Sequence, residues 1–177
     1  MSVDEPPEAE TEIESQPLNV PEDAAVEMAT SGLLSRLKLL ATDRTVIESV
    51  RRFKPFYRFD AELRKKFLRG DDIVHDGMIV VDASTGIARP ILDEYVETTT
   101  TRVPEAELLE CDINEEEALR KARRQRLETQ RRDGGEITLS ADADIIYKPV
   151  WLVEFADGRV KSVDATDGEV YDDMTLI

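Results

Sequence analysis

Apolar residues in the first half of the chain recur with the spacing of an amphipathic helix. The spacing i, i+1, i+4, i+7 occurs over 33–40 and again over 46–53, and a similar pattern covers 61–69. Such one-face patterns predict helices in these three stretches. Pro55 is expected to end the second helix, and Gly70 is expected to cap the third.

Other stretches have the composition of strands. β-Branched and aromatic residues predict strands over 78–82, 87–91 and 95–103. In the second half, Asn114 followed by three glutamates is a capping box, which predicts a helix to about Arg132. Strands are then expected over 136–140, 146–155 and 159–163.

Two parts of the chain share a motif. An aromatic-Lys-Pro sequence begins at Phe53 and again at Tyr147, and Asp-Ala turns closed by glycine follow at 82–86 and 164–168. In each turn the aspartate is expected to bind the turn backbone, and the glycine to adopt a left-handed conformation. The likeness has two interpretations, an internal duplication or a chance match of turn residues.

These patterns predict an α+β fold. Residues 1–31 contain nine acids, no base and four prolines, which predicts a disordered acidic tail. Two helix-plus-antiparallel-meander units are expected behind it, over 32–103 and 104–177, and an internal duplication would explain them. The expected core comprises Leu37, Leu40, Ile47, Val50, Phe53, Tyr57, Phe67, Ile79, Val81, Trp151, Val153, Phe155, Val160 and Val163.

The second copy, chiefly residues 147–171, resembles a PepSY-type domain, and residues 53–90 resemble it more loosely. The likeness lies in Trp151 followed by Val153-Glu154, an Asp-Gly turn at 157, and Val163-Asp164-Ala165 before Gly168. The resemblance implies a cystatin-like arrangement of a helix and antiparallel strands. It also implies a small binding or inhibitory module rather than an enzyme. Its motif occupies turn and core positions, so it transfers no ligand-binding residue.

The net charge of the chain limits the classes of partner that it can bind. Among 177 residues, 39 acids outnumber 23 bases, which gives a formal net charge of −16. Free nucleic acid and anionic membranes are therefore poor partners for the molecule as a whole. Many acids with few lysines are typical of halophilic proteins, whose carboxylate surfaces stay hydrated in high salt. An ordinary acidic protein is the alternative.

The sequence also indicates a location. Cys111 is the single cysteine, so no internal disulfide can form. The acidic N-terminus does not resemble a signal peptide, and no apolar run is long enough to cross a bilayer. We therefore expect a cytoplasmic protein with no membrane insertion.

The sequence contains few candidates for a catalytic or metal-binding site. Asp164, Asp167 and Glu169 are weak candidates for holding a hard cation, although a hairpin turn on an acidic surface explains them equally. His75 is the single histidine, and the sequence offers it no nucleophile or metal partner. We expect no cofactor, no catalytic residue and no enzymatic activity.

Basic residues gather in two stretches. Residues 33–70 carry eleven bases and four acids, with aromatic residues between them, and residues 119–132 carry seven bases and one acid. The leading interpretation is a non-enzymatic interaction or assembly module that binds a protein partner or itself. The alternative is a nucleic-acid-associated factor that uses residues 51–69, unless these bases are paired with acids. The candidate partner-binding residues are Arg51, Arg52, Lys54, Tyr57, Arg58, Lys65, Lys66, Arg123 and Arg124.

Overall fold

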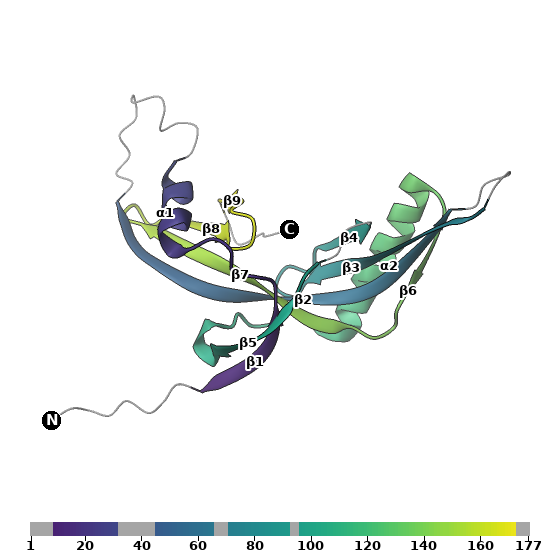
Figure 1. Cartoon of the computed structure of the whole chain (residues 1–177), viewed down its shortest axis with the longest axis horizontal. Helices are drawn as coiled ribbons and strands as arrows, with labels where there is room; N and C mark the ends of the chain where they lie inside the picture. Colours follow the sequence, from purple (N-terminus) through teal and green to yellow (C-terminus); the bar gives the residue numbers. More distant parts are fainter. Residues whose placement is uncertain (1–8, 32–44, 66–70, 93–95, 173–177) are drawn as a thin grey trace. The chain divides into compact units, whose positions relative to one another are not determined.

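The protein is mainly β-structure. The computed structural model describes residues 9–31, 45–65, 71–92 and 96–172, of which 50% lie in strands and 22% in helices. The elements (Figure 1) are β1 (Glu10–Ser15), α1 (Glu22–Thr30), β2 (Val46–Lys65), β3 (Ile73–Asp82), β4 (Ala88–Leu92), β5 (Thr99–Pro104), the 3₁₀ turn η2 (Glu105–Glu107), α2 (Glu115–Asp133), β6 (Glu136–Leu139), β7 (Asp144–Phe155), β8 (Val160–Asp164) and β9 (Val170–Tyr171).

The predicted α+β fold of two helix-plus-meander units is wrong. The described residues contain two α-helices and one large mixed sheet of nine strands, ordered β4-β3-β2-β7-β1-β5. In addition, β6 pairs with β2, β8 with β7, and β9 with β8. Most pairs are antiparallel, but β1 meets β7 in parallel.

The largest error concerns β2, because its residues were expected to form two helices. Residues 46–53 and 61–65 are strand, whereas 33–40 and 66–69 lie outside the described residues. Ala61–Arg64 pair with β3 on one side and with β6 on the other, which satisfies the backbone on both edges. Pro55 stands within the strand, directly before Phe56, the first residue paired with β3.

The predicted disordered tail is also wrong over Glu10–Thr30. Ile13 of β1 is 7% exposed, and Ala25 and Ala29 of α1 are buried. These few apolar side chains give the acidic segment enough buried surface to order. Pro17 and Pro21 lie outside both elements, so they do not interrupt either one.

The predicted capped helix after Asn114 is confirmed. The helix after Asn114 forms, and the Asn114 side chain accepts the N–H of Glu117 at 2.9 Å.

Of the expected core, Ile47 and Val160 are 60% and 42% exposed and Val50 is half-buried. Leu37, Leu40 and Phe67 lie outside the described residues, and the remaining members are buried.

The chain forms two compact units made of alternating stretches. The first unit comprises 1–54, 98–109 and 147–176, and the second comprises 55–97, 110–146 and 177. Strands β2 and β7 each contribute residues to both units. The boundaries predicted at residues 32 and 104 stay sequence-based predictions.

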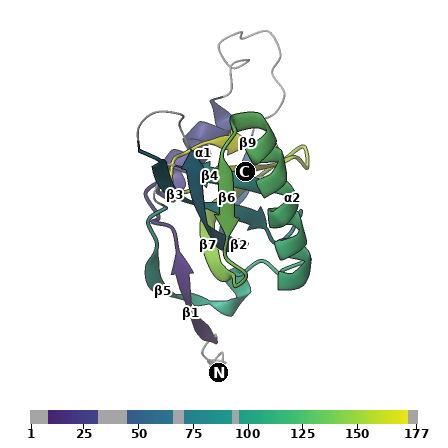
Figure 2. The same ribbon diagram turned by 90° about the vertical axis from the view of Figure 1, so that its right-hand side faces the viewer.

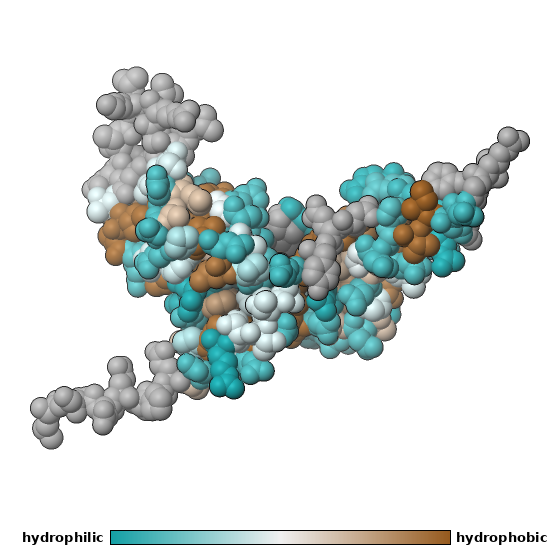
Figure 3. Space-filling model, viewed as in Figure 1, coloured by the Kyte–Doolittle hydropathy of each residue, from teal (hydrophilic) through white to brown (hydrophobic). Residues whose placement is uncertain are grey.

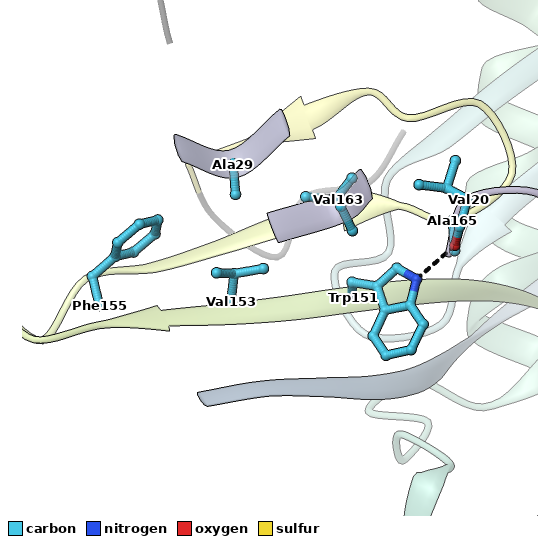
Figure 4. Close-up of a cluster of buried hydrophobic side chains, with 8 residues drawn as sticks. Val20, Ala29, Trp151, Val153, Phe155, Val163 and Ala165 are labelled. Carbon is cyan, nitrogen blue, oxygen red and sulfur yellow. Dashed lines mark hydrogen bonds between the residues drawn. The ribbon is translucent and has the colours of Figure 1, made fainter. Parts of the chain in front are cut away.

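The first unit packs α1 against β8 and β7. Its core includes Val20, Trp151, Val153, Phe155 and Val163 (Figure 4). The Trp151 indole Nε1–H donates to the Val20 carbonyl at 2.9 Å, the dashed line in that figure. This bond ties the chain just before α1 to the strand below it.

The second unit packs α2 across β3, β4 and β6 (Figure 2). Tyr57, Phe59, Ile79 and Val81 form the core beneath the helix. Phe56, Met78, Val80 and Ile146 form a separate buried cluster, because successive strand residues point to opposite faces.

The two Asp-Ala turns have matching hydrogen bonds, as their shared motif predicts. Asp82 Oδ1 accepts the N–H of Ser84, and Asp164 Oδ1 accepts the N–H of Thr166, both at 2.8 Å. Gly86 and Gly168 close the turns with φ of +69° and +83°. Each turn therefore has the local geometry that Asp and Gly favour.

Each turn also anchors the start of a helix. The Ala83 carbonyl accepts the N–H groups of Asp112 and Ile113, just before α2. The Ala165 carbonyl accepts those of Asn19 and Val20, just before α1.

Candidate functional site

Helix α2 is held from its first turn. The Tyr57 hydroxyl donates to the Ile113 carbonyl at 3.1 Å, and the backbone of Asp112 and Ile113 is bound to Ala83. Asn114 caps the first turn of α2. The chain that enters the helix is therefore held by three contacts, with the Tyr57 hydroxyl, the Ala83 carbonyl and the Asn114 side chain. The side of α2 that faces solvent is therefore fixed as well.

The inner face of α2 is made of small residues. Ala118, Ala122 and Thr129 are buried, and both alanines pack in the cluster that contains Phe59 and Val81. Small side chains let the helix backbone approach the sheet closely. Several long side chains of α2 are then left on the outer surface.

Four arginines and a leucine occupy that outer surface, which we name the arginine face. The side chains of Arg120 and Arg124 are 63% and 81% exposed, and Leu127 is 45% exposed. Arg123 and Arg131 are exposed too. At about 1.5 Å per residue, the face extends about 16 Å along the helix.

Only part of this positive charge is neutralised. Arg120 pairs with Glu116 and Arg124 pairs with Glu128, each at 3.0 Å and four residues apart. Exposed pairs of this kind contribute little stability and exchange readily with other partners. Arg123 and Arg131 make no ion pair with any carboxylate in the described part of the chain.

The predicted partner-binding residues of the first unit do not form an open patch. Arg51 makes a two-pronged ion pair with Glu107, at 2.8 and 3.1 Å. The Arg52 guanidinium donates to the Arg51 carbonyl at 2.9 Å, and Lys54 is fully buried. These side chains serve packing and pairing within the unit.

The candidates in the second unit are similarly engaged. Tyr57 is 7% exposed and binds Ile113, and Arg58 pairs with Asp144 at 2.6 Å. Lys65 is half-buried at the end of β2, and Lys66 lies outside the described residues. Of the predicted set, Arg123 and Arg124 are the two that stand on a shared exposed surface.

The carboxylates considered for a metal belong to a turn. Asp164 is fully buried, accepts the N–H of Thr166 and forms an ion pair with Lys148. Asp167 Oδ1 accepts the N–H of Glu169 at 2.9 Å. No cluster of three potential metal ligands occurs among residues 9–31, 45–65, 71–92 and 96–172.

Two other side chains, Tyr171 and Cys111, have pKa values that their surroundings raise. Burial, and then the hydrogen bond to Glu169, raises the pKa of Tyr171. The pKa of the Cys111 thiol is raised as well, mainly by partial burial and also by Asp112, although a hydrogen bond with Tyr57 opposes the shift. His75, the single histidine, lies half-buried in β3.

The sequence contains the arginine face, although Arg120, Leu127 and Arg131 are not among the predicted partner-binding residues. The net positive charge of residues 119–132 does not by itself show which bases share a face. Positions 120, 124, 127 and 131 follow the i, i+4, i+7, i+11 spacing of one helix face. Plotting the bases on the predicted helix would have found them.

The visible surface of the protein carries both hydrophilic and hydrophobic residues. Figure 3 shows mainly hydrophilic residues, with hydrophobic residues in small patches among them. None of the described helices is long and apolar enough to cross a membrane. No model of a protein family, no curated protein and no solved structure matches the chain.

Proposed function

We propose that the protein is a non-enzymatic interaction module that binds an acidic protein segment on the arginine face of α2. The observation that carries this proposal is the placement of four arginines around the exposed Leu127 on one helix. The capped start and packed inner face of α2 support it, since they hold these side chains on a rigid element.

The chemistry of the face favours a carboxylate-rich peptide. Guanidinium groups bind carboxylates through paired hydrogen bonds, and an apolar side chain at the centre of such a site offers an anchor. Leu127 would contact an apolar residue of the partner, whereas a phosphate backbone offers it no equivalent contact.

The alternative of a nucleic-acid factor using residues 51–69 receives less support. Lys54 is buried, and Arg51 and Arg58 are paired with carboxylates. Nucleic acid therefore enters as an outcome of the test below rather than as a second proposal.

The proposal also covers the class of protein, its cellular compartment, its origin and its self-association. The resemblance of residues 147–171 to PepSY-type domains supports a binding module. The single cysteine suits a reducing compartment, so we propose action in the cytoplasm. The dominance of carboxylates supports a halophilic origin, and self-association is proposed alongside binding of a partner.

The test is fluorescence anisotropy with two labelled probes, a peptide of alternating Glu and Leu and a single-stranded oligonucleotide. The double variant Arg123→Glu with Arg131→Glu should weaken peptide binding at least about tenfold, because two unpaired cations become anions. Leu127→Ala should weaken it by a smaller factor. Arg89→Glu is the matched control, since Arg89 is an exposed arginine on β4.

Equal losses in the control and the double variant would reject the arginine face as the binding surface. Tighter binding of the oligonucleotide than of the peptide, lost in the double variant, would assign the face to nucleic acid instead.

A further inference from the structure

Strand β5 is an open edge in the described part of the sheet. The strand order ends at β5, which pairs with β1 along its whole length, from Glu10↔Pro104 to Ser15↔Thr99. No other described strand pairs with its outer side. An edge of this kind presents backbone N–H and C=O groups that a further strand can bind.

This edge lacks most of the features that protect edges from pairing. Its register with β1 is continuous, so no bulge twists it away, and its single proline is the last residue, Pro104. Arg102 is its one charged residue. Three threonines precede it, of which Thr99 and Thr100 are exposed and Thr101 is half-buried, and threonine is a strong strand former.

We propose that β5 pairs antiparallel with β5 of a second copy of this chain, with the two-fold axis at Thr101. Thr101 then faces Thr101 of the second copy, Thr100 faces Arg102, and Thr99 faces Val103. No like charges face each other, and threonine pairs across strands are favourable. The inference names the surface for the proposed self-association, and it does not depend on α2.

The side-chain faces agree in this register. Thr100 and Arg102 lie on the exposed face of the strand pair, opposite Glu14 and Glu12 of β1. Thr101 and Val103 lie on the other face, where Ile13 and Val103 are buried together. Residues that meet across the two-fold axis have the same parity, so the exposed Thr100 and Arg102 meet on one face and Thr99 meets Val103 on the other.

The charges of the strand pair are complementary to a second copy. Arg102 already pairs with Glu12 at 3.5 Å, and Glu14 accepts a hydrogen bond from Thr100. Because Arg102 faces Thr100 of the second copy, it stands two strands, about 10 Å, from Glu14 of that copy. A register moved by two residues toward Pro104 would place Arg102 opposite itself, which disfavours that register.

The proposed two-fold pairing is tested by the molar mass in solution, measured by light scattering after size-exclusion chromatography in concentrated KCl. The wild type should be a dimer. Thr101→Lys and Thr101→Glu should each be monomers, because each variant places two like charges opposite one another at the axis. A one-to-one mixture of the two variants should restore the dimer, since lysine then faces glutamate.

The matched control is Thr138→Lys on β6, an exposed threonine on another strand of the sheet, which should remain dimeric. Unchanged circular dichroism and Trp151 emission will show that the variants fold. A monomeric wild type, a dimeric Thr101→Lys or a monomeric mixture would overturn the proposal, as would dissociation by Thr138→Lys. Thr101→Lys should still bind the acidic peptide, and Arg123→Glu with Arg131→Glu should still dimerise, so the two proposals fail separately.

Discussion

Replacement of Tyr57 by phenylalanine removes one oxygen from the second unit and leaves the ring in place. The Tyr57 hydroxyl donates to the Ile113 carbonyl at 3.1 Å, and the residue is 7% exposed. The bond lies at the entry to α2, so its loss affects the packing of that helix directly. We expect the Tyr57→Phe variant to fold and to be less stable than the wild type.

The magnitude follows from the carbonyl that is left behind. A fully buried acceptor without its donor costs about 1–3 kcal/mol, and this bond is partly buried, whereas a domain has about 5–15 kcal/mol of total stability. We expect a loss of about 1–2 kcal/mol, because the ring volume is retained and no cavity larger than one oxygen forms.

The measurement is urea unfolding in concentrated KCl, followed by far-ultraviolet circular dichroism and by the fluorescence of Trp151, the single tryptophan. Tyr171→Phe is the control, since it removes the same atom from an exposed hydrogen bond to Glu169 and should change stability by less than about 0.5 kcal/mol. Equal effects of the two variants would refute the structural role of the Tyr57 bond.

Three further predictions concern a turn, a thiol and the solvent. Gly168→Ala should destabilise the protein in urea unfolding more than Gly158→Ala, which should cost about 1–2 kcal/mol. Both glycines have positive φ, but a Cβ at Gly168 would lie 2.9 Å from Met28 Sδ, whereas Gly158 has open space; equal losses would contradict this. The alkylation rate of Cys111 should rise at higher pH in the folded protein than in urea, because its pKa is raised. Tyr57→Phe should move that rise higher still, and a rise at lower pH would contradict the assignment. The urea midpoint should increase up to about 1 M KCl, since salt screens the repulsion of a chain with net charge −16; a midpoint that falls would argue against halophilic adaptation.

The sequence predicted best those features that depend on neighbouring residues. The Asn114 cap, the length of α2 and the two Asp-Ala turns all follow from interactions within a few positions. The fold class failed at β2, because its conformation depends on pairing with other strands, with the following β3 and with β6, which lies far away in sequence. Apolar residues spaced as on a helix face were outweighed by strand partners on both sides.

The acidic segment failed for a related reason. Composition predicted disorder over residues 1–31, but Ile13 and Ala25 need few apolar neighbours to become buried. Those neighbours come from distant parts of the first unit, such as Val103 and Val163. For the site, the predicted Arg123 and Arg124 lie on the arginine face, whereas Arg51 and Arg58 were lost to ion pairs that only the fold reveals.

The interleaved composition of the units has a consequence for how the chain is made. In the first unit, Val20 near one end binds Trp151, 131 residues later, and its neighbour Ala165 is later still. During translation the early segment must therefore wait, unpaired, until the ribosome has added its distant partners. Contacts of such long separation slow folding. The first unit cannot complete its core until Ala165 has been added, whereas the second unit lies almost entirely between residues 55 and 146 and has its partners earlier.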